Sequence, residues 1–182
     1  MPDLEVLENP KTNLASEVIS SDGKTLGKYY FNDNRTPVTF DELPKHLVDA
    51  LIATEDIRFY SHSGIDFKRT FGAVLKLGKD GGGSTITQQL AKLLFTGEGS
   101  RDILERLTQK FKEYIIAVRL ERHYTKDEII TQYLNLYDFG NNGDGIRSAA
   151  RIYFGKEPID LDINESAILV GMLKNSSLYN PR

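Results

Sequence analysis

The sequence contains no cysteine, no long apolar run and no excess of basic residues, and each absence excludes a class of protein. Without cysteine, the chain can form neither disulfides nor thiolate metal sites. This absence fits a reducing cytosol and an exported protein without disulfides equally well, so it does not identify the compartment. Because no run of about 18 apolar residues occurs, no segment is expected to span a bilayer as a helix. The acidic stretch Met1–Glu5 lacks the apolar core of a signal peptide. A net charge of -3 disfavours a general nucleic-acid binder, so no nucleic-acid partner is expected.

The length and composition indicate one globular domain with an appendage. At 182 residues, of which 40% are hydrophobic and 27% charged, the chain can bury a sizeable core and is not disordered throughout. We expect an extended segment over residues 1–40 and a mostly helical domain over residues 41–182. In the first segment, Asp22-Gly23 lies between Glu17–Ile19 and Leu26–Phe31, which favours a small β-hairpin. An isolated surface turn is the alternative.

A glutamate ends the first helical pattern. From about Leu43 the apolar residues follow a helical period, and Pro44 suits the first turn of that helix. Glu55 lies four residues after Leu51 and three after Ile52, so it ends the same apolar face. An acid at this place is unusual because glutamate is rarely buried unpaired. A solvated helix end is the simple interpretation, and a group placed for proton transfer is the functional one.

A second polar segment begins with a glycine cluster. Gly81–Gly83 leads into a helical pattern that starts with Ser84 and Thr85. The spacing of Thr85 and Gln88 matches a capping box, which would serve helix initiation alone. Capping does not require three glycines, further hydroxyls or the second glutamine, Gln89. We therefore expect a polar cradle for a ligand here.

The longest predicted helix runs from Ile103 to Arg122 and carries two stripes. The apolar face is predicted from the spacing of Leu104, Leu107, Phe111, Ile115 and Val118. The polar stripe consists of Arg106, Lys110 and Glu113. Its simplest explanation is a surface ion pair between Lys110 and Glu113, worth roughly a few tenths of a kcal/mol.

Three later helices are predicted from capping and turn signals. Thr125 and Glu128 form a capping box at the start of one helix. The glycine-rich turn Gly140–Gly145 precedes a helix over Ile146–Phe154. Asp162 and Glu165 have the spacing that caps a last helix, which is expected to reach Met172.

In this order and spacing, the motifs resemble the peptidoglycan glycosyltransferase (transglycosylase) domain of class A penicillin-binding proteins, glycosyltransferase family 51. The resemblance covers nearly the whole chain. Its motifs are Glu55-Asp56-x-x-Phe59-x-x-His62-x-Gly64, Gly82–Gln89, Lys110-x-x-Glu113, Lys126–Asn135, Gly145–Lys156 and Glu165–Ala167.

The resemblance implies a mainly α, lysozyme-like fold with a small jaw subdomain that abuts the membrane. It also implies that the enzyme polymerises lipid II into glycan strands, with inversion at C1 and release of undecaprenyl pyrophosphate. The implied partners are lipid II, the growing glycan strand and the bacterial membrane, at the outer face of the cytoplasmic membrane. A transmembrane helix before Met1 and a transpeptidase domain after Arg182 are expected.

The resemblance also implies roles for individual residues. Glu55 is the general base, a role that suits a carboxylate because a sugar hydroxyl is a poor nucleophile. Glu113 is the second acid, on the side of the donor pyrophosphate. A divalent cation, Mg²⁺ or Mn²⁺, is implied by the resemblance alone. The implied substrate-binding residues are Ser84, Thr85, Gln88, Gln89, Lys92, Arg106, Lys110 and Lys112.

The sequence departs from the family pattern at two positions. Gln109 precedes Lys110 where the family usually has arginine, and Gly72 occupies a place near which a basic residue is common, with Arg69 as a possible substitute. These departures concern individual phosphate contacts. His62 is expected to hold a loop by hydrogen bonds, and a proton shuttle is the alternative.

Two other functions compete with the transferase. A lysozyme-like hydrolase also uses a glutamate on a helical fold, but it has no pyrophosphate for Gln88, Gln89 and Lys92 to hold. A catalytically silent cell-wall assembly module would not require Glu55 and Glu113. The segment Phe67–Leu77 is the predicted membrane-facing surface, with an ordinary amphipathic helix as the alternative.

Overall fold

The computed structural model of the chain describes residues 16–29, 35–70, 83–96 and 102–182. These residues are mostly helical, with one two-stranded antiparallel sheet, which confirms the predicted mainly α class. They divide into two compact units, one within Leu51–Tyr133 and one made from Lys11–Ala50 and Leu134–Arg182. No helix in the described ranges is long and apolar enough to cross a membrane.

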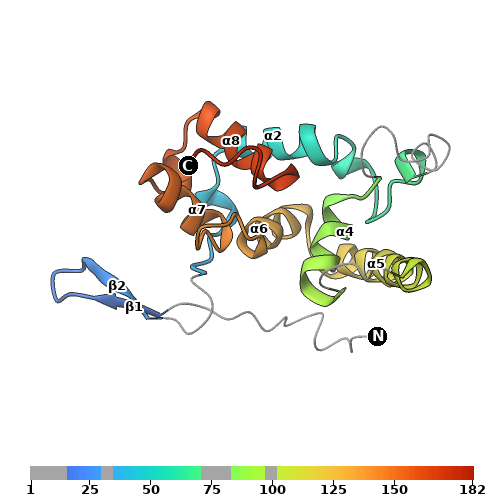
Figure 1. The fold of residues 1–182 in the computed structure, drawn as a ribbon, viewed down its shortest axis with the longest axis horizontal. Coiled ribbons are helices and arrows are strands. Elements are labelled where there is room, and N and C mark those ends of the chain that lie inside the picture. The colour runs from blue at the N-terminus through green and yellow to red at the C-terminus, as the bar shows by residue number, and fades with distance from the viewer. Residues whose placement is uncertain (1–15, 30–34, 71–82, 97–101) are drawn as a thin grey trace. The chain divides into compact units, whose positions relative to one another are not determined.

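The helices follow the chain in the order labelled in Figure 1. Two helices, α2 and α6, contain the boundaries between the units. The elements are η1 (Phe40–Glu42), α2 (Lys45–Glu55), η2 (Phe59–Ser61), α4 (Ile86–Ala91), η3 (Lys92–Thr96), α5 (Ile103–His123), α6 (Lys126–Leu136), α7 (Gly145–Phe154), η4 (Pro158–Asp160) and α8 (Ile163–Lys174).

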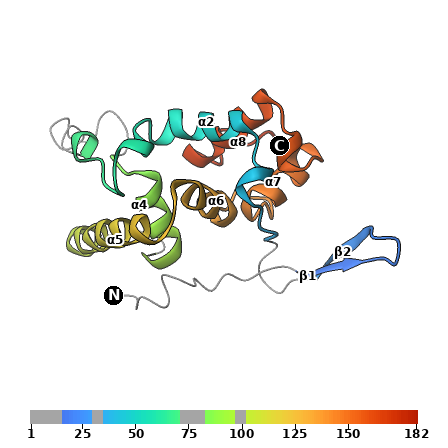
Figure 2. The same cartoon turned by 180° about the vertical axis from the view of Figure 1, so that it is seen from behind.

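The predicted hairpin is present. Strands β1 (Ser16–Ile19) and β2 (Thr25–Tyr29) pair antiparallel, as Figure 2 also shows from behind. The Gly23 amide donates to the carbonyl of Ser20 (2.9 Å), and Gly23 has a φ of 80°. Glycine adopts this left-handed conformation without the steric penalty of a side chain, so the Asp-Gly dipeptide alone was enough to predict the hairpin turn.

Capping signals also located the helix starts correctly. Thr85 and Gln88 form the predicted capping box of α4, and Asp162 and Glu165 form that of α8. At the start of α6, the Thr125 amide donates to the Glu128 carboxylate (2.7 Å). Each box satisfies backbone N–H groups that have no partner within the helix.

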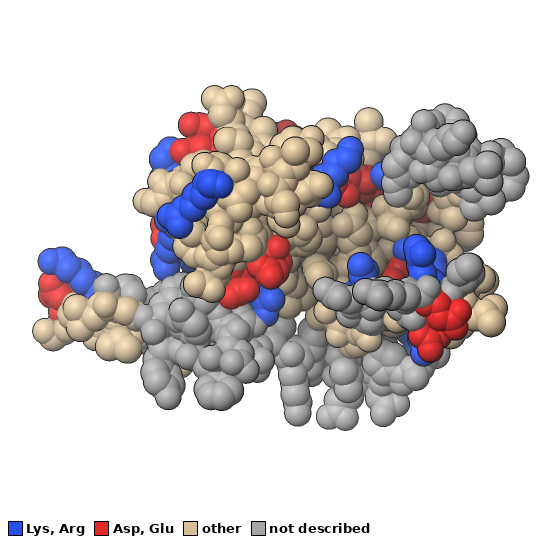
Figure 3. All heavy atoms as spheres, viewed as in Figure 1, with Lys and Arg blue, Asp and Glu red and all other residues tan. Residues whose placement is uncertain are grey.

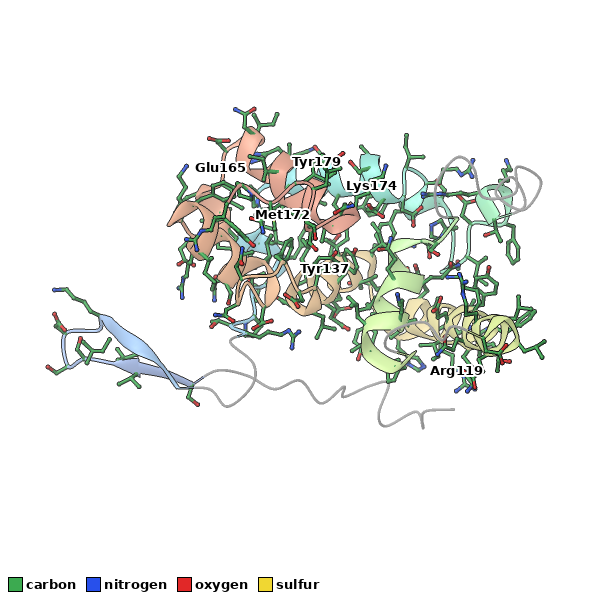
Figure 4. All side chains as sticks on the ribbon, viewed as in Figure 1. Arg119, Tyr137, Glu165, Met172, Lys174 and Tyr179 are labelled. Atoms are coloured by element: carbon green, nitrogen blue, oxygen red, sulfur yellow. The ribbon has the colours of Figure 1, made fainter. Side chains whose placement is uncertain are left out.

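The second unit has its own core. Helix α7 buries Ile146, Ala149 and Ala150, and α8 buries Leu169 and Met172. The hydroxyl of Tyr137 donates to the carbonyls of Met172 (3.3 Å) and Leu173 (3.0 Å), and Figure 4 labels Tyr137 and Met172.

The charged side chains of this unit form local ion pairs. Lys156 pairs with Glu165 (2.7 Å), and Arg151 pairs with Glu157 (2.5 Å). Figure 3 shows basic and acidic side chains interspersed on the face that it draws. Such pairs contribute only about 0–1 kcal/mol each when exposed, so the buried apolar residues are the main source of stability.

The prediction for the apolar face of α5 is wrong. Leu104, Leu107, Phe111 and Ile115 are 45–72% exposed rather than packed on the core, and Val118, the fifth predicted member, is half-buried. The opposite face is buried instead, through Glu113, Ile116, Ala117 and Leu120. Helices α4 and α5 lie against each other, as Figures 1 and 2 agree. The spacing of the apolar residues along α5 identified an apolar stripe, but this spacing does not determine which face of the helix packs against its neighbour.

Candidate active site

The first unit holds Glu55 at the last position of α2. Leu51, one turn earlier, is fully buried, whereas the Glu55 side chain is only partly buried. The Arg69 guanidinium donates to the Glu55 backbone carbonyl, one of the carbonyls that lack a partner within the helix. The carboxylate therefore lies where an apolar face ends, within reach of both the protein and solvent, as the sequence predicted.

One amide group holds the Glu55 carboxylate. Gln89, on α4, donates its Nε2 to Glu55 Oε2 (2.8 Å). The carbonyl of the same amide, Oε1, accepts from the hydroxyl of Tyr133 on α6 (2.9 Å). Gln89, predicted as a substrate contact, therefore contacts the predicted base directly.

The neighbouring acid, Asp56, has a different role. The residue is 1% exposed, and its carboxylate accepts from Nε2 of His62 (2.9 Å) and from the backbone amide of Ile86 (3.1 Å). A carboxylate at a helix N-terminus is stabilised by the N–H groups there. Asp56 thus connects the end of α2, the loop with His62 and the start of α4. This agrees with the expected loop-holding role of His62.

Gly64 lets this loop lie against α5. Its φ is 90°, and a Cβ placed on it would lie 2.8 Å from the backbone C and O atoms of Ala117. The Gly64 carbonyl accepts from the Thr85 hydroxyl (2.7 Å) and from Gln88 Nε2 (3.3 Å). Thr85 and Gln88 were predicted as substrate contacts, but both are buried, and their polar groups bond the protein. Their geometry is that of a cap and a loop support.

The loop is also held by a charged pair. Arg58 donates to Asp66 through Nε (2.8 Å) and Nη2 (2.9 Å), and the Arg69 amide donates to the same carboxylate (3.0 Å). Burial opposes ionisation of Asp66, but these hydrogen bonds outweigh it and lower the pKa of Asp66 below its ordinary value of 3.8. The Asp66 carboxylate is therefore ionised at neutral pH and fixes the segment after Gly64.

A second polar cluster joins the start of α4 to α5. The Lys110 ammonium donates to Ser84 Oγ (2.9 Å) and to Glu113 Oε2 (2.6 Å). Glu113 is 6% exposed, so this is not the simple surface ion pair considered above. Burial, and then the negative charge of Glu113, raises the pKa of the adjacent Tyr114 above its ordinary value of 10.0. The structure thus brings together three of the predicted site residues, Ser84, Lys110 and Glu113.

Three predicted basic residues are exposed. Lys92 begins the π-helical turn η3 that follows α4, and Arg106 and Lys112 lie on α5. π-Helical turns are frequent at functional sites. Gly81 and Gly82 of the glycine cluster, as well as Gly72, lie outside the described residues.

A partly buried ion pair that was not predicted from the sequence supports α4. The Lys126 ammonium bonds Glu121 (2.7 Å) and the backbone carbonyl of His62 (2.7 Å), and lies 4.3 Å from the centre of the Phe59 ring. Glu121 also accepts from the Thr87 hydroxyl of α4 (2.6 Å). Glu121 and Lys126 are five residues apart, but His62 and Thr87 lie 64 and 34 positions from their partners, so no local pattern could have indicated the whole cluster.

We expect Lys126→Met to lower the free energy of unfolding by about 2 kcal/mol, because the substitution leaves the buried Glu121 carboxylate without its cation. Urea unfolding at pH 7 measures the change. Lys45→Met is the matched control, since Lys45 pairs with Asp49 while 86% exposed and should change stability by only about 0–1 kcal/mol. Equal losses in the two variants would contradict the role of the buried pair.

Comparison with known proteins decides the family. The family model described as "Transglycosylase" matches residues 22–182. The chain belongs to this transglycosylase family. Penicillin-binding protein 1F of Bacillus subtilis (strain 168) is 43% identical over an alignment of 171 residues that covers 92% of this chain and 23% of that protein. Penicillin-binding protein 1A of Escherichia coli (strain K12) is 39% identical over an alignment of 186 residues, gaps included, that covers 100% of this chain and 21% of that protein.

The transglycosylase chain spans about a quarter or less of the length of these relatives. Penicillin-binding protein 1A of Aquifex aeolicus (strain VF5), 37% identical, is covered over 25% of its length. The matches confirm the resemblance to the glycosyltransferase domain of class A penicillin-binding proteins. The predicted transmembrane anchor and transpeptidase domain stay predictions.

Proposed function

We propose that this transglycosylase domain polymerises lipid II into glycan strands, with Glu55 as the general base. The observation that carries the proposal is the Glu55 carboxylate held by Gln89, in one compact unit with the Ser84–Lys110–Glu113 cluster. An oriented carboxylate suits deprotonation of a hydroxyl, and a cationic cluster suits a departing pyrophosphate.

In the proposed reaction, Glu55 acts on the acceptor. The 4-hydroxyl of the acceptor lipid II transfers its proton to Glu55 as its oxygen forms a bond to C1 of the terminal sugar of the growing chain. The bond between C1 and the pyrophosphate oxygen breaks on the opposite face, so C1 inverts. Undecaprenyl pyrophosphate leaves with the bonding electron pair, and Glu55 then releases its proton to solvent.

The leaving pyrophosphate carries concentrated negative charge, which Lys110 would balance. Glu113 fixes the Lys110 ammonium at 2.6 Å and Ser84 adds a hydroxyl that can donate. Lys92, Arg106 and Lys112 are exposed cations in the same unit that can contact phosphate oxygens. Thr85 and Gln88 would contribute by shaping the cradle, because their polar groups bond Gly64.

A divalent cation also stays a proposal. The described residues contain no group of three or more histidine, cysteine or acidic side chains that could hold a metal ion. Glu113 and Ser84 could hold Mg²⁺ or Mn²⁺ only together with substrate phosphates, an arrangement that Mg²⁺ commonly adopts. A cation there would neutralise charge on the pyrophosphate, and it would compete with Lys110 for the same two oxygens.

The test is incubation of the chain with lipid II in detergent, with and without divalent cation, followed by separation of products by size. Polymer that lysozyme digests is the expected product. If the chain shortens preformed glycan and forms no polymer from lipid II, the hydrolase is favoured. Absence of both activities in the folded chain would overturn the proposed function.

We also propose that the domain acts at the membrane surface, where the lipid tail of the substrate resides. The exposed apolar stripe of α5, formed by Leu104, Leu107, Phe111 and Ile115, supports this proposal, and Phe67, 75% exposed, adds an apolar side chain in the same unit. A row of apolar side chains beside lysines and arginines is typical of helices that lie in a membrane interface. The rest of the predicted membrane-facing segment, Phe71–Leu77, lies outside the described residues.

We expect Phe111→Asp to weaken binding to anionic liposomes about tenfold or more, because an aspartate replaces an exposed apolar side chain that would insert into the membrane interface with a charge that anionic lipid repels. Liposome co-sedimentation measures it. Leu178→Asp is the control, since Leu178 is 70% exposed, similar to Phe111 at 65%, but lies in the other unit. Equal binding by the wild type and Phe111→Asp would exclude the α5 stripe as the membrane contact.

A further inference from the structure

A chain of two hydrogen bonds connects the core to Glu55. The Tyr133 hydroxyl donates to Gln89 Oε1 (2.9 Å), and Gln89 Nε2 donates to Glu55 Oε2 (2.8 Å). Tyr133 has an exposure of 0%, Gln89 is partly buried, and Glu55 lies at the partly exposed end of α2. The chain therefore runs from a fixed group on α6, through α4, to the predicted base; Figure 1 labels the three helices.

The chemistry of the three groups gives this chain one direction. An ionised carboxylate only accepts, so it requires the NH₂ end of the Gln89 amide. The carbonyl end then points to Tyr133, whose hydroxyl can donate to it. The reverse orientation of the amide would place a carbonyl oxygen against a carboxylate oxygen, and it would change Tyr133 from a donor to an acceptor. The carboxylate thus sets the orientation of the amide, and Tyr133, by donating to the carbonyl end, holds the amide in that orientation.

Two charged residues near Glu55, Arg69 and Asp56, form their hydrogen bonds with groups other than the Glu55 carboxylate. Arg69 contacts the backbone carbonyl of Glu55, not its carboxylate. The Asp56 carboxylate bonds Ile86 and His62. Within the described part of the chain, Gln89 is the one side chain that hydrogen-bonds the Glu55 carboxylate. The orientation of the base consequently depends on this amide.

We propose that Tyr133 is a positioning residue for the transfer reaction, acting through Gln89 to hold the Glu55 carboxylate oriented toward the acceptor hydroxyl. The inference rests on the proposed role of Glu55 as base. It also gives Gln89 a role different from the substrate contact predicted from the sequence. Because neither Tyr133 nor Gln89 needs to touch the substrate in this role, their removal should affect turnover more than substrate binding.

The test measures lipid II polymerisation by the wild type, Tyr133→Phe, Gln89→Leu and the double variant. We expect Tyr133→Phe to lower kcat about tenfold, as the loss of one hydrogen bond predicts, with KM nearly unchanged. The ratio kcat/KM should fall by about the same factor as kcat, because the lost hydrogen bond orients the base and does not bind the substrate. In the Gln89→Leu background, the same tyrosine substitution should have no further effect.

Tyr137→Phe is the matched control. The Tyr137 hydroxyl also donates within the protein, to the carbonyls of Met172 and Leu173, but in the other unit. This variant should lose a similar amount of thermal stability and keep the wild-type kcat. If Tyr133→Phe fails to fold, Gln89→Asn provides the same test, because its shorter side chain cannot span Tyr133 and Glu55.

Two sets of results separate the failure of this inference from failure of the proposed function. If the wild type polymerises lipid II and the effects of the two single substitutions multiply in the double variant, Tyr133 does not act through Gln89. A wild-type kcat in both single variants, or in Gln89→Asn where Tyr133→Phe does not fold, would also overturn the inference. If the wild type makes no polymer, or Glu55→Gln is fully active, the proposed function itself fails.

Discussion

Replacement of Glu55 with glutamine is expected to lower the rate of lipid II polymerisation by about 10³-fold. The substitution keeps the size of the side chain but removes the group that accepts the acceptor proton, and general base catalysis typically contributes about 10²–10⁴-fold. The variant should bind lipid II normally, so kcat should fall while KM changes little. Steady-state rates over a range of lipid II concentrations measure both constants.

The control for this variant is Glu105→Gln. Glu105 is an exposed acid in the first turn of α5, and the proposed reaction gives it no role. Its substitution makes the same change in net charge and should leave the rate within about twofold of the wild type, as surface substitutions usually do. Polymerisation by Glu55→Gln at the wild-type rate would show that another group is the base. A wild type that is itself inactive with lipid II would favour the silent assembly module.

The features that could be predicted from the sequence are those that depend on neighbouring residues. The hairpin turn at Gly23 follows from one dipeptide, and the start of α4 follows from Thr85 and Gln88. The position of Glu55 at a helix end follows from the spacing of Leu51 and Ile52. In each case, the hydrogen bonds or packing that decide the outcome lie within a few residues.

The packing of α5 could not be predicted in the same way. Phe111 and Ile115 form the more apolar stripe, yet the buried face is the one with Glu113 and Ala117. A glycine decides this, because Gly64 lets a loop approach the α5 backbone at Ala117. The approach joins residues 53 positions apart in the sequence, and only the tertiary structure shows it.

The same limit applies to the candidate site. The sequence identified Glu55, Lys110 and Glu113 by type and spacing. It could not separate Gln88, which bonds the Gly64 carbonyl, from Gln89, which bonds Glu55, although the two are adjacent on α4. Successive residues of a helix point about 100° apart, so neighbours in a motif can have different partners. Which partner each one meets depends on the elements packed around the helix.

Gly64→Ala is expected to destabilise the first unit by about 4 kcal/mol. The new Cβ would lie 2.8 Å from two backbone atoms of α5, which cannot rotate away as a side chain could, and the φ of 90° adds strain. Overpacking costs about 1–3 kcal/mol, and a strained backbone conformation costs about as much again. Thermal and urea unfolding of the purified variant measure the loss.

Gly155→Ala distinguishes the cost of backbone strain from the cost of the steric clash with α5. Gly155 ends α7 with a φ of 68°, but a Cβ placed on it has no atom within 4 Å. Its substitution should therefore cost only the strain, about 1–2 kcal/mol. The excess loss in Gly64→Ala then measures the close approach of the loop to α5.

Because the Gly64 carbonyl also bonds Thr85 and Gln88, displacement of this loop should disturb the start of α4 and hence Gln89. Gly64→Ala should consequently lose polymerisation even at temperatures where it stays folded, and full activity there would show that the position of the loop does not control the site.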